Sequence, residues 1–189
     1  MKLLYILLSA FIFTYSDTLS KVKYIDIKKA AGKWYEIARM PTWFSKNCQD
    51  GSITFTMRSD GDIDILSEAD EYASGLKTHK STTGRGKFID HTKTRMRVNF
   101  TPEWLPKMLS NLLNGECYIA ALDEENYNYM VLVDVKKSYL WILCREHTMD
   151  DNIYQELLSV CKSLGFDIEQ MLKNSELKYK EKYLQQKDC

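Results

Sequence analysis

The sequence predicts an all-β protein with one flanking helix: an eight-stranded up-and-down antiparallel β-barrel with a C-terminal α-helix on its wall. Between residues 32 and 145, short segments that alternate apolar and polar residues follow one another, separated by turn residues, which is typical of a meander. Eight such segments are enough to close a barrel that holds one small ligand and has no exposed edge. One segment with helical periodicity follows the last of them.

The first strand is expected over Gly32–Arg39, after a short helical turn capped by Asp26. Apolar residues then alternate with polar ones in the second strand, and a Ser-Asp-Gly-Asp turn at residues 59–62 leads into the third. The residues of these two strands expected on one face are Ile53, Phe55, Met57, Ile63, Ile65, Ser67 and Ala69. The remaining strands are expected over residues 81–88, 95–100, 117–122, 129–135 and 139–145. Residues 101–115 interrupt the rhythm and are apolar enough for a short helix or a lid.

The helix is expected over about residues 149–164, with Thr148 as its N-cap and Gly165 as its stop. Ile153, Leu157 and Leu164 recur at helical spacing, so one apolar stripe faces the barrel. The predicted domain spans residues 21–173, with the barrel ending near residue 147. Residues 174–189 form a charged tail that is expected to be mobile.

Residues 1–20 read as a signal peptide: Lys2 precedes an apolar run, and small residues follow it. The alternative is a buried N-terminal strand or helix. Because residues 1–20 contain no cysteine, no lipid anchor is expected there. The protein is therefore expected to be secreted or periplasmic, and soluble after cleavage. It has five cysteines, so at least one is unpaired within a monomer.

Composition and motifs argue against several other functions. The formal net charge is zero, so no overall field favours nucleic acid. The chain has no CxxC, no HExxH and no glycine-x-serine-x-glycine, and its three histidines are isolated. Gly84-Arg85-Gly86 lacks the third glycine of a dinucleotide loop. No catalytic residue, metal site or cofactor is expected, and Cys117 and Cys144, in apolar strand sequence, are expected to be inert core thiols.

Three segments together resemble the characteristic segments of the lipocalin family. The first is Gly32–Arg39 with its glycine-x-tryptophan, the second runs from Ala121 to Tyr127, and the third is Leu140–Arg145. Leu122 stands where the family usually has threonine. Details of the first and third segments are similar to the branch of bacterial lipocalins and apolipoprotein D. The resemblance implies that Gly32, Trp34 and Arg145 close the narrow end of the barrel and are structural, with the guanidinium over the indole.

The resemblance also implies a carrier of a small hydrophobic ligand, with a fatty acid or a lysophospholipid as the expected partner. The residues expected to line the cavity are Phe55, Met57, Ile65, Ser67, Ala69 and Trp141. The small side chains of Ser67 and Ala69 favour a cavity, and the alternative is a barrel filled by its own side chains. Two other functions stay open: an enzyme that acts on a lipid in the same calyx, and a protein that contacts host or membrane surfaces through its loops. The oligomeric state is not predicted.

A disulfide between Cys48 and Cys189 is expected from the same resemblance, since apolipoprotein D-like relatives tie the C-terminal tail to the loop before the second strand. Cys161 is the competing partner for Cys48, because it falls near the wall-facing stripe of the helix.

Charge placement predicts a basic mouth. In an up-and-down barrel the connections over residues 41–50, 73–80, 101–114 and 134–138 share one end. These connections hold six lysines and three acidic residues, a net charge of +3: Lys46, Lys77, Lys80, Lys107, Lys136 and Lys137 against Asp50, Glu103 and Asp134. We expect peripheral contact with anionic membrane through this mouth and a ligand with a negative head group. The alternative is a set of scattered, solvated lysines.

Overall fold

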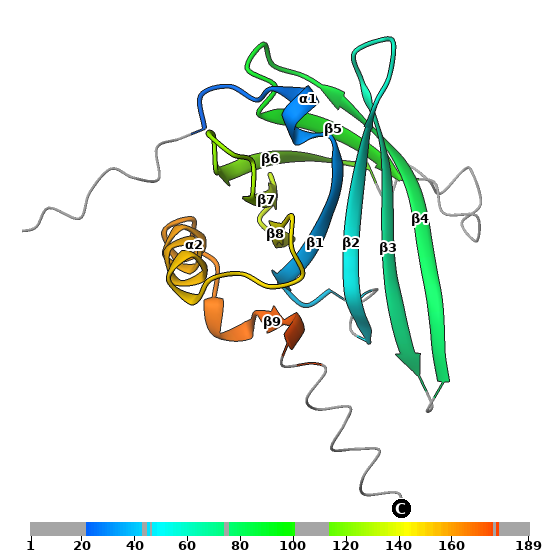
Figure 1. Cartoon of the computed structure of the whole chain (residues 1–189), viewed down its shortest axis with the longest axis vertical. Coiled ribbons are helices and arrows are strands. Elements are labelled where there is room, and N and C mark those ends of the chain that lie inside the picture. The colour runs from blue at the N-terminus through cyan, green and yellow to red at the C-terminus, as the bar shows by residue number, and fades with distance from the viewer. Residues whose placement is uncertain are drawn as a thin grey trace, which may run out of the picture.

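The computed structural model describes residues 22–42, 45, 47–73, 76–100, 114–175 and 177. They form the predicted closed eight-stranded antiparallel barrel with one main helix (Figure 1). Its strands are β1 (Gly32–Arg39), β2 (Cys48–Met57), β3 (Ile63–Ala73), β4 (Leu76–Phe88), β5 (Arg95–Phe100), β6 (Asn114–Leu122), β7 (Tyr129–Asp134) and β8 (Leu140–Cys144). Each pairs with the next, and β1 pairs with both β8 and β2, which closes the barrel. A short β9 (Leu172–Lys173) adds to β1.

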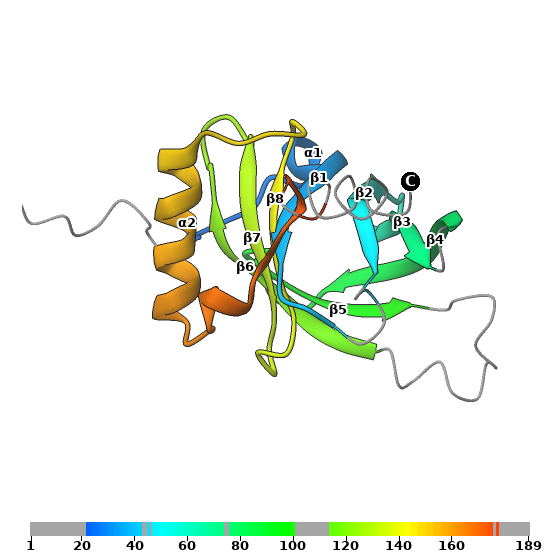
Figure 2. The same cartoon turned by 90° about the horizontal axis from the view of Figure 1, so that it is seen from below.

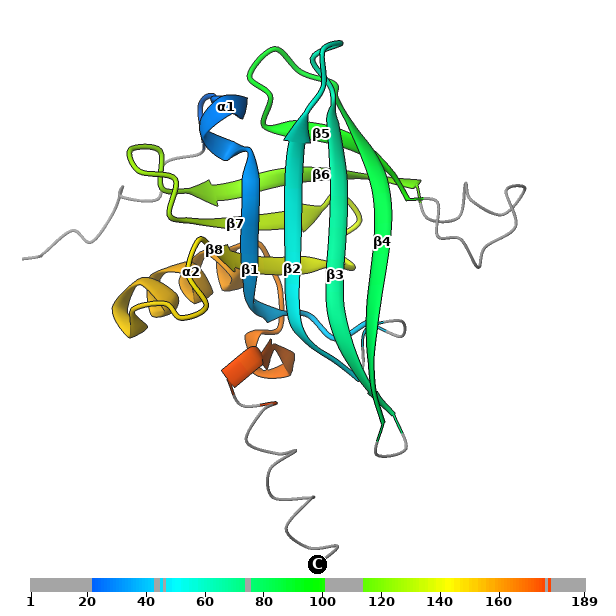
Figure 3. The same ribbon diagram turned by 45° about the vertical axis from the view of Figure 1, so that its right-hand side comes forward.

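The barrel has two different ends. We call the end that carries α1 (Ile27–Ala30) and the β2–β3 turn the closed end, and the opposite end the mouth (Figure 1). At the mouth, β2, β3 and β4 extend past the rest of the wall (Figure 3). The β4 strand begins at Leu76 rather than at the predicted Ser81, because β3 and β4 stay paired without interruption from Ile63↔Gly86 to Ala73↔Leu76. The polar residues of β4 before residue 81 gave no strand signal of their own.

The main helix, α2 (Asp151–Ser163), lies outside the barrel, beside β6, β7 and β8 (Figure 2). Its N-cap is Asp150, so the prediction of Thr148 was wrong: the Asp150 carboxylate accepts from the amides of Asn152 at 2.8 Å and Ile153 at 3.3 Å. A carboxylate caps as well as a hydroxyl does and also favours the positive end of the helix dipole. Gly165 follows the helix with φ +90°, a left-handed conformation that suits glycine at this place. A 3-10 turn, η2 (Ile168–Gln170), then leads into β9.

Two apolar cores share the barrel wall. The inner core fills part of the lumen, and the outer core lies between the wall and α2. Tyr154, Leu157 and Cys161 are the buried residues of α2. The predicted stripe is right at Leu157, but Tyr154 is buried where Ile153 was expected, and Ile153 and Leu164 are only partly buried. Cys161 is therefore fully buried in the outer core, and within the part of the chain that the structure describes neither Cys161 nor Cys48 is joined to another cysteine. The competing Cys48–Cys161 disulfide is absent from the structure.

Several predictions fall outside the described residues: the signal peptide over residues 1–20, the Cys48–Cys189 disulfide, because Cys189 is not among them, and most of the helix or lid expected over residues 101–115. Its last two residues, 114 and 115, belong to β6. Of the helices in the described ranges, none is long and apolar enough to cross a membrane.

Candidate functional site: a lumen with one polar and one apolar wall

Trp34 and Arg145 pack together at the closed end. The Trp34 side chain is fully buried, and its indole N–H donates to the carbonyl of Ala30 at 2.9 Å. The guanidinium carbon of Arg145 lies 3.7 Å from the centroid of the Trp34 ring. The same guanidinium donates to four carbonyls: Lys29 at 2.6 Å, Ala31 and Lys33 at 2.9 Å, and Tyr127 at 3.2 Å. Gly32 has φ +97°, and a Cβ there would come within 3.3 Å of the guanidinium, so a side chain is unfavourable for two reasons.

The deep lumen, next to the closed end, is almost filled. A residual cavity of about 20 Å³ remains, which is close to the least that one water molecule needs. It is lined by Ile25, Ile27, Ala30, Ala31, Phe55, Ile63, Phe88, Met96, Ile119 and Met130. In this half of the barrel, side chains fill the lumen, which is the alternative to a cavity that the sequence left open.

The six side chains expected to line the cavity lie at different depths. Phe55 and Ile65 are buried in the inner core, and Met57 lies at the closed end of β2 with 43% of its surface exposed. Trp141 is partly buried against the inner core, nearer the mouth, where it pairs with Arg39 of β1. Ser67 and Ala69 follow Ile65 on the same face of β3 and are half-buried. Only Ser67, Ala69 and Trp141 therefore fall in the half of the lumen that opens to the mouth. We call this half the upper lumen; it faces the bottom of Figure 1.

Two charged residues of β1 face this upper half. Glu36 pairs in register with Leu143 of the inner core, and Arg39 pairs with Trp141. They share a face although they are three residues apart, because the register shifts between Glu36 and Ala38, and such a bulge changes which residues point inward. The two side chains form a buried ion pair, and Arg39 is only 2% exposed. Gly51 makes room, since a Cβ there would lie 2.8 Å from a Glu36 carboxylate oxygen.

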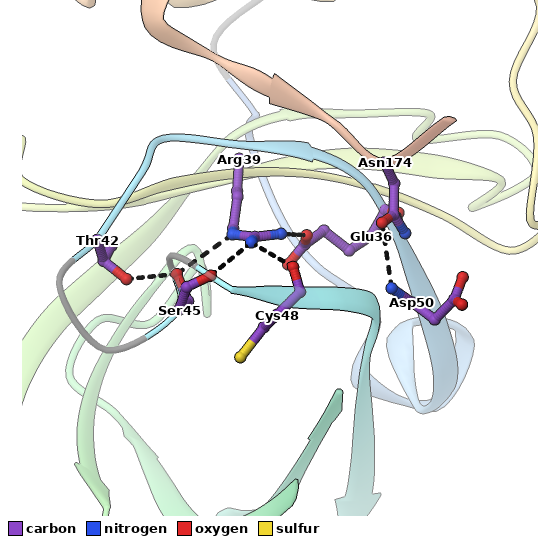
Figure 4. A network of polar contacts seen from close by, with 7 residues as sticks. All are labelled: Glu36, Arg39, Thr42, Ser45, Cys48, Asp50 and Asn174. Atoms are coloured by element: carbon purple, nitrogen blue, oxygen red, sulfur yellow. Dashed lines mark hydrogen bonds and ion pairs between the residues drawn. The ribbon is translucent and has the colours of Figure 1, made fainter. Parts of the chain in front are cut away.

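Arg39 uses its remaining donors on the β1–β2 connection (Figure 4). It donates to the carbonyls of Ser45 and Cys48 at 2.6 Å each, and to the Ser45 hydroxyl at 3.2 Å. Burial raises the pKa of Glu36 above its ordinary value, although the charge and hydrogen bond of Arg39 act in the opposite direction. The pair therefore fixes the inner side of the mouth and is closed to a ligand.

A second ion pair lies at the mouth on the same face. Glu71 pairs in register with Cys48, and Lys80 with Ala69, so all four follow the inward alternation of Ile63 and Ile65. The Lys80 ammonium lies 3.3 Å from a Glu71 carboxylate oxygen, and the two side chains are 56% and 33% exposed. Burial raises the pKa of the Cys48 thiol, with smaller effects from Arg39, Glu71, Glu36 and Lys80. These four charges therefore surround the thiol at the inner mouth.

The upper lumen thus has two unlike walls. The polar wall is formed by β1 to β4, and its residues are Glu36, Arg39, Ser67, Glu71, Lys80 and Thr82. The apolar wall is formed by β5, β7 and β8, and its residues are Val98, Phe100, Leu132 and Trp141. The buried Asp134 of β7 also lies on this side. Gly84 allows the polar wall to pack directly against the apolar wall, because a Cβ at residue 84 would lie only 2.7 Å from the Phe100 ring. The arrangement can receive a molecule with one polar and one apolar part.

The seam between β1 and β2 is bridged by a side chain from the C-terminal segment. The two strands pair in register only from Gly32↔Phe55 to Tyr35↔Ser52. Nearer the mouth, Asn174 donates to the carbonyl of Glu36 and accepts from the amide of Asp50, both at 3.1 Å (Figure 4). The amide of Asn174 thus stands where a strand-to-strand hydrogen bond would lie, one residue beyond the predicted end of the domain.

The charge count behind the basic mouth was wrong at the β3–β4 hairpin. Lys77 pairs with Asp70 at 2.8 Å and Lys80 with Glu71, two acids that lie just before the range counted. Lys137 donates to the carbonyl of Leu164 at 2.8 Å, and Lys46 and Lys107 are outside the described residues. Lys136 is the one lysine of that set with no partner among the described residues. Two of the six lysines are therefore balanced by a nearby carboxylate.

The described residues offer no nucleophile and no metal centre in the lumen. Cys117 faces the lumen, and burial raises the pKa of its thiol to about 12, with Asp134 acting in the same direction. Such a thiol stays protonated at neutral pH. Within the described ranges, no group of three or more histidine, cysteine or acidic side chains is arranged to hold a metal ion.

Comparisons with known proteins agree with this geometry. Residues 25–176 match the model of the lipocalin-like domain family. The chain is 28% identical over 152 residues to the outer membrane lipoprotein Blc of Escherichia coli K12, covering 80% of this chain and 79% of that protein. It is 28% identical over 155 residues to apolipoprotein D of Mus musculus, covering 77% and 74%. Insecticyanin of Manduca sexta has a similar fold, with a TM-score of 0.56 at 16% identity and 85% of each chain covered.

Proposed function

Because the chain belongs to the lipocalin-like domain family, in its branch of bacterial lipocalins and apolipoprotein D, we propose that it carries a single-chain amphiphile in the upper lumen, with its polar end toward the mouth. Family membership supports the binding of a small hydrophobic ligand. The expected ligand is a fatty acid or a lysophospholipid, carried by a secreted or envelope protein. We assign Ser67, Ala69 and Trp141 to the ligand site, and Phe55 and Ile65 to its floor.

The observation that carries this proposal is the difference between the two walls of the upper lumen. An acyl chain against Phe100, Leu132 and Trp141 would gain ~0.8 kcal/mol for each buried methylene. A polar head beside Ser67, Glu71 and Lys80 would keep its hydrogen bonds. The packed deep lumen limits how far the chain can enter, unless residues such as Met96 and Met130 move aside.

Native mass spectrometry of the protein purified from its own source tests the proposal. A co-purified single-chain lipid is the expected result, and the Trp141→Ala variant should retain less of it. An Ile89→Ala variant is the control, because Ile89 is exposed at the closed end and its loss should not change the retained lipid. Protein that carries no lipid and does not bind an added fatty acid or lysophospholipid would overturn the proposal.

The calyx enzyme is disfavoured by its thiols, since the pKa values of both Cys48 and Cys117 are raised. Peripheral contact with anionic membrane belongs to the proposal but rests on fewer charges than the sequence suggests. Flotation with anionic and neutral vesicles tests it, with Lys136→Glu as the variant that should weaken binding to the anionic vesicles. Equal binding of wild-type protein to both vesicle types at low salt would exclude this contact.

A further inference from the structure

We infer that the Glu71–Lys80 pair at the inner mouth selects an amphiphile with a zwitterionic head group over one that carries a single charge. This inference rests on the proposed function and names the ligand class. Five charged side chains among the described residues face the upper lumen: Glu36, Arg39, Glu71, Lys80 and Asp134.

Three of these five charges are already committed inside the protein. Glu36 and Arg39 pair with each other, and Arg39 also donates to two backbone carbonyls. Asp134 is buried, and one of its carboxylate oxygens accepts from the amide of Tyr139 at 2.6 Å. None of the three can turn to a ligand without leaving a buried charge uncompensated, which is costly. The charges that a ligand can reach are Glu71 and Lys80, one of each sign.

The spacing of this pair sets the selectivity. A carboxylate that approaches Lys80 also approaches Glu71, whose charge is 3.3 Å from the same ammonium. The attraction and the repulsion then nearly cancel, and the same holds for a lone cation near Glu71. A zwitterion that places its anion on Lys80 and its cation on Glu71 gains both contacts. Its chain can reach the apolar wall, because Gly84 of β4 lies directly beside Phe100 of β5.

The hairpin supplies its own matched control. Asp70 and Lys77 form an ion pair of 2.8 Å in the same two strands. They occupy the other parity of the alternation, so they lie on the outer face of the barrel. Removing both charges there takes as many charges from the hairpin as removing Glu71 and Lys80 does, without changing the lumen. It also weakens the contact between Asp70 and His79, at 3.1 Å on the outer face.

The experiment is a calorimetric titration of the full-length protein with four dodecyl amphiphiles below their micellar concentrations: dodecylphosphocholine, dodecanoate, dodecyltrimethylammonium and dodecyl maltoside. We expect dodecylphosphocholine to bind roughly three- to tenfold more tightly than either singly charged probe, as two partly exposed ion contacts allow. Free phosphocholine distinguishes the chain from the head, and it should bind far more weakly than dodecylphosphocholine.

The single variants should change the order of affinities among the probes in opposite directions. Glu71→Gln should favour dodecanoate and Lys80→Gln should favour dodecyltrimethylammonium. In Glu71→Gln/Lys80→Gln the three charged probes should bind equally, with the affinity for dodecyl maltoside unchanged. Asp70→Asn/Lys77→Gln should keep the wild-type order. Thermal unfolding of each variant checks that it is folded.

The outcomes separate this inference from the proposed function. If dodecyl maltoside binds but the three charged probes bind the wild type with equal affinity, the zwitterion selection is wrong and the carrier function stands. The same conclusion follows if dodecanoate binds the wild type most tightly. If free phosphocholine binds as tightly as dodecylphosphocholine, the charge pair recognises the head but the apolar wall is not used, which overturns the carrier. If none of the amphiphiles binds, both are overturned.

Discussion

Each end of the barrel is held by an arginine, the half-buried Arg145 at the closed end and the buried Arg39 at the mouth, and the two have different partners. At the closed end, Arg145 lies on an indole and donates to four backbone carbonyls, and among the described residues it forms no ion pair. At the mouth, Arg39 shares its donors between two carbonyls and the carboxylate of Glu36. Backbone carbonyls and an indole do not titrate, whereas a carboxylate does. The contacts of Arg145 at the closed end therefore do not change with pH, whereas the mouth contains groups that respond to a ligand or to pH.

The largest expected effect comes from removing the indole at the closed end. Trp34→Ala should lower the free energy of unfolding by about 3–5 kcal/mol, because it empties a fully buried site. Trp141→Ala, at the partly buried mouth position, should cost only about 1–2 kcal/mol, since it removes less buried area. Urea unfolding followed by circular dichroism measures both. Equal losses would show that the two ends are equally important for stability.

A more conservative change at the closed end should have the next largest effect. Arg145→Lys keeps the charge but replaces a fork of donors with a single ammonium. Because at least two of the four carbonyls would lose their partner, we expect a loss of about 2–3 kcal/mol. Arg85→Lys on the exposed outer face of β4 is the control and should change stability by less than about 0.5 kcal/mol. A loss for Arg145→Lys as small as that of the control would show that charge alone suffices.

The closed end could be predicted from the sequence, and the mouth largely could not. Gly32, Trp34 and Arg145 fall in segments with a family resemblance, and strand alternation places Phe55 and Ile65 in the lumen. The inward direction of Arg39 depends on a bulge after Glu36, and period-2 alternation from Trp34 puts Arg39 on the outside. The pairs of Lys77 and Lys80 depend on a hairpin register, which polar residues specify weakly. A charged residue on the inward face of a predicted strand, such as Glu36, was the one available signal.

Asn174 tests whether the seam at the mouth is the weaker part of the wall. Asn174→Ala removes two hydrogen bonds that bridge β1 and β2, which should cost about 1–2 kcal/mol. Hydrogen exchange should accelerate most at the amide of Asp50, because that amide loses its acceptor. Asn126→Ala, in the exposed turn at the closed end, is the control and should leave that exchange unchanged. Unchanged exchange at Asp50 in Asn174→Ala would mean that the seam holds without the bridge.

The smallest expected effect is a dependence of stability on pH that originates at the mouth. Burial raises the pKa of Glu36 in the folded protein above the ordinary glutamate value of 4.5, and Arg39 offsets this only in part. The folded state then binds its proton more tightly than the unfolded state does. The stability that this proton contributes is fully present below pH 4.5 and is lost as the pH rises through the raised pKa.

The pKa of Asp90, near the closed end, shifts in the opposite direction. Burial alone would raise its pKa, but hydrogen bonds from Thr92, Arg95 and Thr94 outweigh burial and lower it. Its contribution is present above the ordinary pKa of an aspartate and is lost as the pH falls through the lowered value. The two groups therefore act in different pH windows, and a variant at Glu36 isolates the mouth.

The measurement is Tm against pH for the wild type and for Glu36→Gln, with Glu36→Gln/Arg39→Met as a second variant in case the single change leaves Arg39 too poorly compensated. Between pH 4.5 and neutrality, the wild type should lose stability relative to both variants as the pH rises, because only the wild type has a carboxyl to ionise there. An Asp90→Asn variant should keep the wild-type slope of Tm against pH in this window. It should change the curve only at lower pH, where Asp90 titrates. Parallel curves for the wild type and Glu36→Gln in that window would show that the carboxyl at the mouth is no more titratable than the carbonyls at the closed end. The contrast between the two arginine sites would then concern geometry alone.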